Sequence, residues 1–238
     1  MAFLTSDRVE VPAVTADRMR EIDRIAIEET GPSLLQMLEH AGRSLAEVAL
    51  GLIGKPLDEA VVVVLAGRGG NGAGGICAAR HLAARVERVV LSISEPNGLI
   101  EAARIQRSIF GHTGGRELGP AELDPLRPDL VLDALIGYGL SAAPHGETAR
   151  LIDWANAQPC PVLSLDVPSG IDATTGAAPG VAVTPEATLT LALPKTGLAH
   201  AATGRLLLAD IGIPEATFRR AGVRRAPFGR GFVIPLRT

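Results

Sequence analysis

The sequence has few aromatic residues, few cysteines and little net charge, and each shortage excludes a class of protein. Aromatic residues make up 3% of the 238 positions, so a core must be built from smaller aliphatic side chains. The two cysteines, Cys77 and Cys160, are too few for a disulfide framework and show no metal-binding spacing. A formal charge of −3 gives no general attraction to nucleic acid or to acidic membranes. We therefore expect neither as a partner.

Long apolar runs and an amino-terminal signal peptide are also missing. No apolar run approaches the roughly 20 residues that span a bilayer. The first residues, MAFLTSDRVEVP, carry acidic side chains early and lack the apolar centre of a signal peptide. These absences predict a soluble protein in the cytoplasm. The length predicts one domain over residues 1–238, with a core at about 14–214 and an arginine-rich tail at 215–238.

Two helices are expected before residue 60. Residues 15–29, TADRMREIDRIAIEE, space their apolar side chains with a helical period, and Thr15 is suited to cap the first turn. Ser33 and Gln36 have the spacing of a capping box, which predicts a second helix running to about residue 53.

From residue 60 the pattern alternates between apolar strands and amphipathic helices. Strands are predicted at 60–67, 86–94, 128–137, 161–170, 187–194 and 204–212, and helices at 75–85, 99–110 and 146–158. Repeated strand–helix–strand units predict an α/β fold with a mainly parallel sheet covered on both faces. The tail, with six arginines in its last twenty residues, is predicted to be solvated with a short edge strand. Contact with an anionic ligand or a partner is the alternative.

Glycine and polar residues follow the predicted strands, at the edge where parallel sheets bind ligands. Residues 67–75, GRGGNGAGG, contain the G-x-G-x-x-G pattern that lets a backbone approach a phosphate at a helix start. Glu95 follows the next strand, where an acid can hold a ribose hydroxyl. This pattern predicts a loop that contacts a nucleotide-like ligand.

Three charged residues near strand ends are candidates for chemistry. Asp133 lies inside the apolar run LVLDALIG, and Asp166 precedes a Pro-Ser-Gly turn. A carboxylate in either place can bind a cation, hydrogen-bond a substrate or carry a proton, although Asp166 could simply organise its turn. Lys195 is either a handle for an anion or a proton, or a surface lysine in a turn. Among the histidines, His145 is the best placed for a role, because it lies in the loop after the third strand.

Five segments resemble, in the right order, those of the NAD(P)H-hydrate epimerase family, also called the YjeF N-terminal domain family. They are EIDRIAIEETGPSLLQMLEHAG, the glycine stretch followed by AARHL, DLVLDALIGYGL, LSLDVPSGIDATTG and LALPKTGLAHAATGRLLLADIGIP. The resemblance covers residues 14–214 and implies a Rossmann-like three-layer α/β/α domain. It also implies a homodimer that interconverts the R and S epimers of hydrated NADH and NADPH, so that a separate dehydratase can clear both.

The resemblance also implies the site residues. A potassium ion would be held by Asn71, Asp133 and Ser169, and catalysis would fall to Asp166 and Lys195. Substrate contacts would come from Asp166 and from two loops, namely Gly70, Asn71, Gly72, Ala73 and Gly74 in the first, and Gly137, Tyr138, Gly139, Leu140, Ser141, Ala142 and Ala143 in the second.

The chain departs from the family in the glycine stretch. The family reads N-N-G-G-D-G where this chain reads GNGAGG, so Gly74 stands in place of an aspartate. If that aspartate is essential to turnover, the chain is a catalytically impaired ligand-binding or interaction module on the same scaffold. A Rossmann oxidoreductase is disfavoured, because Tyr138 is followed four positions later by Ala142 and not by lysine.

Overall fold

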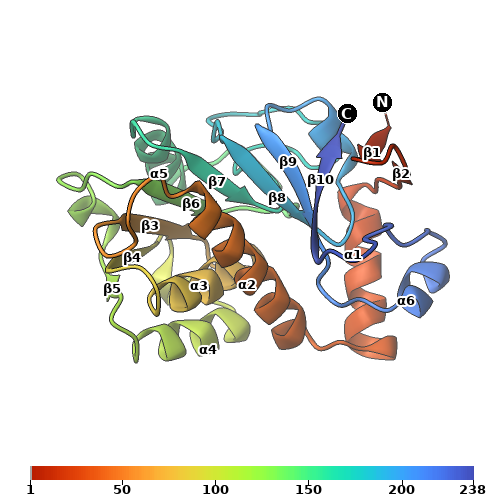
Figure 1. Ribbon diagram of the computed structural model, residues 1–238, viewed down its shortest axis with the longest axis horizontal. Coiled ribbons are helices and arrows are strands. Elements are labelled where there is room, and N and C mark those ends of the chain that lie inside the picture. Colours follow the sequence, from red (N-terminus) through yellow and green to blue (C-terminus); the bar gives the residue numbers. More distant parts are fainter. Residues whose placement is uncertain (1) are drawn as a thin grey trace.

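Ten strands form a single sheet in the computed structural model, which describes residues 2–238 (Figure 1). The strands are β1 Phe3–Thr5, β2 Glu10–Val11, β3 Val61–Ala66, β4 Arg88–Ile93, β5 Arg116–Glu117, β6 Leu130–Ala134, β7 Val162–Leu165, β8 Ala187–Leu191, β9 Arg205–Ala209 and β10 Val233–Arg237. The α-helices are α1 Ala16–Ile25, α2 Leu34–Leu52, α3 Gly70–Leu82, α4 Glu101–Phe110, α5 Gly146–Asn156 and α6 Glu215–Arg220.

The sheet is parallel over most of its width. Its order is β2-β1-β10-β9-β8-β7-β6-β3-β4-β5, and every neighbouring pair from β9 to β5 is parallel. The pairs that involve β10, β1 and β2 are antiparallel. The predicted α/β fold with a mainly parallel sheet is therefore confirmed.

Helices cover both faces of the sheet. All six residues of β3 are buried, as expected of a strand packed on both sides. Val62 and Val64 point into a cluster shared with α2, α3 and α4. Val63 and Leu65 point the other way, into a cluster shared with α5. Figure 1 shows α2, α3 and α4 together on one side, which completes the three layers.

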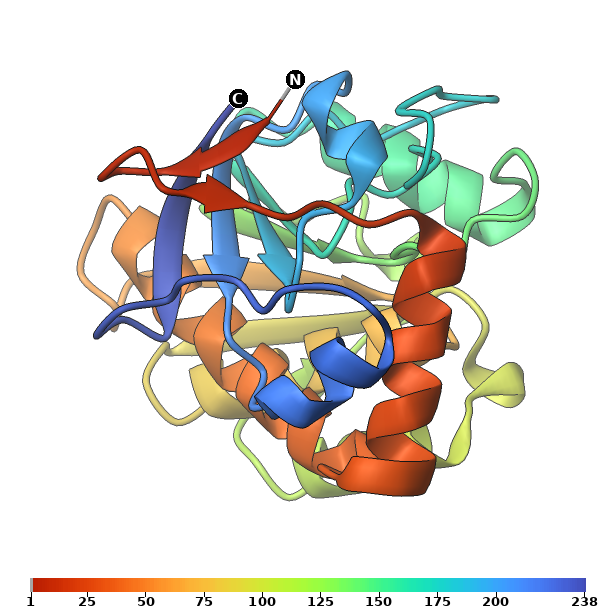
Figure 2. The same cartoon turned by 90° about the vertical axis from the view of Figure 1, so that its right-hand side faces the viewer.

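The two amino-terminal helices begin as their sequences predict. The Thr15 hydroxyl accepts a hydrogen bond from the backbone N–H of Arg18, and Ser33 and Gln36 form the predicted capping box. A π-helical turn, Ala26–Thr30, extends α1. Figure 2 shows α1 beside α6, so the two ends of the chain pack together.

The strand predicted at the edge of the sheet in the carboxyl-terminal segment is interior, and that part of the prediction is corrected, whereas the six arginines of the segment are exposed. β10 lies between β9 and β1, because the unpredicted strand β1 pairs with its outer side and β2 pairs in turn with β1. The side chains of Phe218, Phe228 and Leu236 are buried. Two of the arginines form ion pairs within the chain, Arg220 with Glu29 and Arg225 with Asp210.

Candidate functional site

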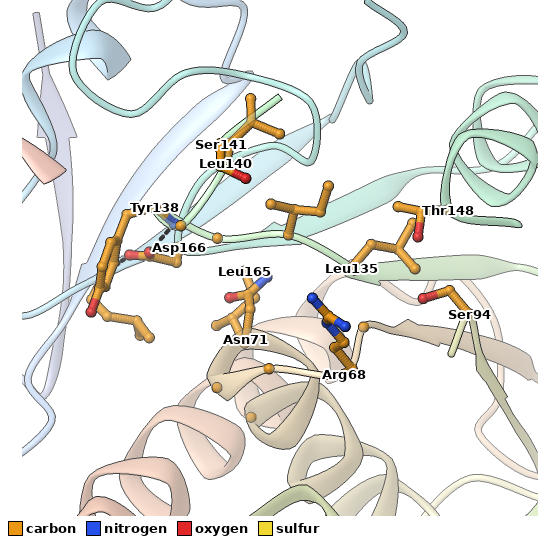
Figure 3. A pocket seen from close by; sticks show the side chains of 18 of the residues that line it. Arg68, Asn71, Ser94, Leu135, Tyr138, Leu140, Ser141, Thr148, Leu165 and Asp166 are labelled. Carbon is orange, nitrogen blue, oxygen red and sulfur yellow. Dashed lines mark hydrogen bonds between the residues drawn. The ribbon is translucent and has the colours of Figure 1, made fainter. Parts of the chain in front are cut away.

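A cavity of about 490 Å³ opens at the carboxyl ends of β3, β6 and β7 (Figure 3). This is the edge at which open parallel sheets bind ligands, and the volume suits a small molecule or part of a dinucleotide. Its walls come from α2, the start of α3, the segment after β6 and the end of β7. The predicted residues that line it are Gly70, Asn71, Gly74, Gly137, Tyr138, Gly139, Leu140, Ser141, Ala142, Ala143, His145 and Asp166.

The glycine stretch is mostly helix and not a loop. α3 begins at Gly70, five residues before the predicted start, so that prediction is corrected. A Cβ on Gly67 would lie 1.9 Å from the carbonyl oxygen of Leu135, and one on Gly72 would lie 1.8 Å from that of Gly67. Glycine is therefore required here because the chain packs on itself. Gly69 and Gly70 face open space, which leaves the amino terminus of α3 accessible to an anion.

Two predicted substrate contacts lie away from the cavity. Ala73 is fully buried in the cluster under α3, and Gly72 packs against Gly67. Gly74, which stands in the place of the family's aspartate, does line the cavity. A Cβ there would lie 2.9 Å from Cδ2 of Leu165, so a larger side chain requires Leu165 to move.

Asp166 lines the cavity, and its two carboxylate oxygens have different partners in the protein. Its Oδ2 accepts a hydrogen bond from the backbone N–H of Tyr138 at 3.2 Å and lies beside Gly137 (Figure 3). Its Oδ1 pairs with the ammonium group of Lys195. The backbone of Asp166 has φ +68°, a conformation that is uncommon outside glycine and is retained where the surrounding structure imposes it.

Lys195 is a buried partner of Asp166 and not a surface lysine. Its side chain is 1% exposed, and its ammonium group also donates to the carbonyl oxygen of Leu191 at 3.0 Å. It does not line the cavity, so it reaches a ligand only through Asp166. Lys195 is thus placed to position Asp166, and its catalytic role stays a prediction.

The carboxyl group of Asp23 on α1 also lines the cavity and was not predicted from the sequence. The Tyr138 hydroxyl donates to its Oδ2 at 2.5 Å, and burial raises the pKa of Asp23. Burial and the nearby Asp23 charge likewise raise the pKa of Tyr138. The sequence indicates the position of Asp23 only weakly, because the residue is a single acid between Ile22 and Ile25, which are buried in the structure.

Asp133 is fully buried inside β6 and has no cationic partner among residues 2–238. Its Oδ2 accepts hydrogen bonds from the Ser164 hydroxyl at 2.7 Å and the Ser169 N–H at 2.9 Å. Its Oδ1 accepts from the Ser169 hydroxyl at 2.5 Å. Burial raises the pKa of Asp133 despite these hydrogen bonds. A buried carboxylate of this kind is stabilised by a nearby cation.

Asn71 completes the group of oxygen donors predicted for a cation. Its Nδ2 is buried without a hydrogen-bond partner, and its Oδ1 lies against Gly137, 3.0 Å from where a Cβ would stand. Ser169 contacts Ile136, the residue before Gly137, because its hydroxyl accepts a hydrogen bond from the N–H of Ile136 at 2.8 Å. Asn71, Asp133 and Ser169 thus converge on one short segment, although only the last two are in direct contact.

The mouth of the cavity carries an exposed pair of opposite charges. Arg68 and Glu95 lie 3.5 Å apart and both line the cavity. Glu95 is therefore at the edge where the sequence predicts a ribose contact, with an arginine beside it that was not predicted.

Over residues 2–238, no helix combines the length and the apolar character needed to cross a membrane.

The chain is similar in sequence to proteins named for one activity. It is 48% identical to the NAD(P)H-hydrate epimerase of Dehalogenimonas lykanthroporepellens over 99% of this chain and 97% of that protein. It is 32% identical to the NAD(P)H-hydrate epimerase of Rhodopirellula baltica, over 90% of each. It is also 33% identical to the bifunctional NAD(P)H-hydrate repair enzyme Nnr of Escherichia coli, of which it spans 39%.

The fold also has a counterpart among solved structures. The crystal structure of yeast ynu0, YNL200c, superposes with a TM-score of 0.80 over 94% of this chain and 100% of that one, at 23% identity. Residues 34–197 match the family model described as YjeF-related protein N-terminus. This match covers more than half of the chain and confirms the resemblance predicted from five short segments. The chain belongs to the family of YjeF-related proteins, in which it corresponds to the amino-terminal domain.

Proposed function

We propose that this protein is an NAD(P)H-hydrate epimerase, an isomerase that interconverts the R and S forms of hydrated NADH and NADPH. The observation that carries the proposal is the carboxylate of Asp166, which lines the cavity at the end of β7, together with the accessible start of α3 in the same cavity. The names of the relatives with high coverage support the same activity.

Substrate binding follows from the two sides of the cavity. The start of α3 offers free backbone N–H groups at Gly69 and Gly70, which suit a phosphate of the dinucleotide. The segment from Gly137 to Ala143 forms the opposite wall and suits the hydrated nicotinamide ring. Arg68 at the mouth adds a positive charge for the phosphates.

The reaction requires a proton to move at one oxygen. The ring nitrogen expels the hydroxyl from C6, and a proton delivered to that hydroxyl lets it leave as water. The ring is then cationic, and water adds to its other face while releasing a proton. In its protonated form Asp166 is suited to give the first proton to the leaving hydroxyl. The carboxylate that remains would stabilise the cation and then accept the proton released by the added water, which restores the protonated form. No change of oxidation state is involved.

Lys195 and Tyr138 hold Asp166 in place for this exchange. The ammonium group of Lys195 fixes Oδ1, and the backbone N–H of Tyr138 fixes Oδ2. Because Lys195 and the peptide of Tyr138 are held by the fold, the carboxylate needs little reorganisation during the reaction.

A potassium ion is the proposed cofactor. The donors Asn71, Asp133 and Ser169 are all oxygen ligands, which suit a hard cation. Asp133, which has no cationic partner among residues 2–238, and the Oδ1 of Asn71 suit such an ion. When bound, the ion would supply a fixed positive charge beside the cavity. It would also offset the burial of Asp133.

The bifunctional relatives support a functional partner. This chain spans less than half of those proteins, so the remainder can carry a second repair activity. We infer that the partner of this epimerase is a separate NAD(P)H-hydrate dehydratase, that the protein is a homodimer and that it works in the cytoplasm.

A catalytically impaired binding or interaction module is the second candidate, favoured by one observation. Gly74 supplies no carboxylate where the family has an aspartate. In this case the protein would bind hydrated NADPH without accelerating its epimerisation.

The test starts from one separated epimer of hydrated NADPH. Purified protein is added in potassium chloride or in choline chloride of equal ionic strength, and chromatography follows the approach to the R/S equilibrium. We expect acceleration that is greater with potassium. A rate no faster than the spontaneous one, together with saturable binding, would support the second candidate.

A further inference from the structure

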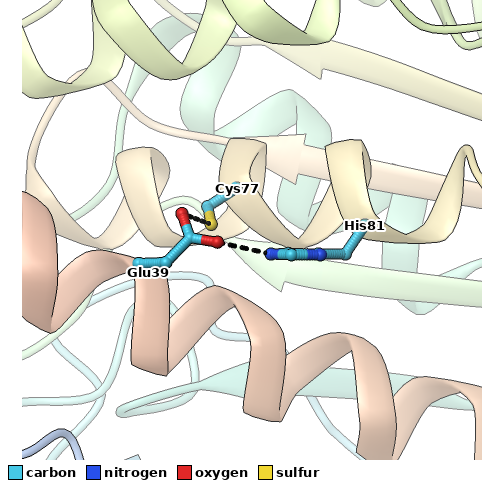
Figure 4. Close-up of side chains that lie close together, drawn as sticks. All are labelled: Glu39, Cys77 and His81. Atoms are coloured by element: carbon cyan, nitrogen blue, oxygen red, sulfur yellow. Dashed lines mark hydrogen bonds and ion pairs between the residues drawn. The ribbon is translucent and has the colours of Figure 1, made fainter.

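A second group of metal-donor side chains lies outside the cavity, between α2 and α3 (Figure 4). Cys77 and His81 stand one turn apart on α3, and Glu39 faces them from α2. One ligand atom from each of the three lies within 4.8 Å of the other two. The sequence does not reveal this group, because 38 residues separate Glu39 from Cys77.

The close packing of the two helices brings these donors together. A Cβ on Gly42 would lie 2.5 Å from Cβ of Cys77, so glycine is required for α2 to come this near. The sulfur of Cys77 is 3.5 Å from Oε2 of Glu39, and Nε2 of His81 is 2.8 Å from Oε1. Donors on a tetrahedral zinc ion lie on the order of 3–4 Å from one another, given metal–ligand bonds of about 2.0–2.3 Å.

A positive charge already occupies the centre of the group. Nη2 of Arg80 donates to Oε2 of Glu39 and lies 3.4 Å from both the sulfur of Cys77 and Nε2 of His81. The hydrogen bonding of Arg80 in this position is incomplete, because its buried Nε has no hydrogen-bond partner. The side chain of Glu39 is 45% exposed, which gives an ion a route from solvent.

We propose that Glu39, Cys77 and His81 bind a thiophilic divalent cation such as Zn²⁺, in the place that the guanidinium of Arg80 fills in the metal-free protein. A thiolate, an imidazole and a carboxylate are typical zinc ligands, unlike the oxygen donors suited to potassium. As the metal–sulfur bond forms, the thiol proton passes to solvent and Arg80 swings outward. Water can take the fourth position.

Removal of the Cys77 proton is the main cost of binding a metal at this site. Burial, together with the charge of Glu39, raises the pKa of Cys77 to about 12. Without a metal the sulfur is therefore a thiol of low reactivity. A bound ion would join α2 to α3, two helices that both line the cavity, and would stabilise the folded protein.

The test is a titration of the metal-free full-length chain with Co²⁺, which reports thiolate ligation by a charge-transfer absorption band. We expect one Co²⁺ per chain, displacement by Zn²⁺, and a higher midpoint of thermal unfolding with either metal. Absence of the band from the folded wild-type protein would overturn the proposal.

Matched variants assign the site. Cys77→Ser should abolish the band, and His81→Gln should weaken binding by roughly tenfold or more. Cys160→Ser removes the other free thiol and should leave the band unchanged. Arg80→Gln should tighten binding several-fold, because it removes the competing cation. A band that survives Cys77→Ser, or affinity that is unchanged or weaker in Arg80→Gln, contradicts the proposal even if another variant folds poorly.

Discussion

Two buried carboxylates at the same edge of the sheet, Asp133 and Asp166, are satisfied in opposite ways. Asp133 is held by hydroxyl and backbone donors and has no cationic partner in the chain from residue 2 onward. Asp166 has an ammonium partner and lines the cavity. The difference indicates different tasks. Asp133 is suited to attract a mobile cation. Asp166 already has the ammonium group of Lys195 beside it and is suited to act on a ligand.

The largest difference between the two carboxylates is expected in turnover. Asp166→Asn removes the group proposed to move the proton and should lower kcat/KM by roughly 10²- to 10⁴-fold, with little change in affinity for the hydrated dinucleotide. Epimerisation kinetics from one separated epimer measure this effect. A loss of less than tenfold in the folded variant would remove Asp166 from the chemistry.

A stability measurement then tests the partner of Asp166. Lys195→Met leaves a buried carboxylate unpaired and should lower the free energy of unfolding by about 3–5 kcal/mol, measured by urea denaturation. The double variant Asp166→Asn/Lys195→Met removes both charges. It should regain most of the stability but none of the activity. Equal stability losses in the single and double variants would argue against the ion pair.

Asp133 is expected to make the stability of the folded protein depend on potassium and on pH. Because burial raises its pKa above 3.8, the folded chain without potassium holds a proton that the unfolded chain releases. The contribution of Asp133 to stability therefore falls as pH rises from about 4 through the folded-state pKa. Potassium should restore stability at neutral pH, by about 2–3 kcal/mol at a concentration a hundred times its Kd.

Thermal unfolding in potassium chloride and in choline chloride measures this response. Asp133→Asn should lose most of the potassium effect, whereas Asp166→Asn should keep it. A potassium response that persists in Asp133→Asn would place the cation elsewhere and contradict the role of Asp133 as a cation ligand.

The smallest expected effect concerns Gly74, whose added side chain would press on Leu165, the neighbour of Asp166. Gly74→Asp should cost about 1–3 kcal/mol of stability through overpacking. Gly74→Ala makes the same contact without the charge and is the matched control. A gain of activity in Gly74→Asp that Gly74→Ala does not share would show that the missing carboxylate limits turnover. Equal changes of activity and stability in the two variants would show that packing against Leu165, and not the carboxylate, causes them.

Local signals in the sequence predicted local structure well. Thr15, Ser33 and Gln36 act over three residues, so their caps are visible without knowledge of the fold. The positions of Asp133 and Asp166 at strand ends follow from the alternation of strands and helices.

Features that depend on long-range packing were not predictable in this way. Lys195 meets Asp166 only because the turn after β8 folds back on the sheet. β10 is interior only because strands from the other end of the chain pair with it. The helical state of residues 70–75 is another such case, since glycine by itself disfavours helix.

That glycine-rich start of α3 has a consequence for how the protein folds. Four glycines in its first two turns cost about 4 kcal/mol of helix propensity relative to alanine, so this segment cannot nucleate on its own. It becomes helical only when the segments around Gly67 and Leu135 have come together beneath it. The floor of the cavity is therefore assembled late, and its amide protons should exchange with solvent sooner than those of β3 and β6.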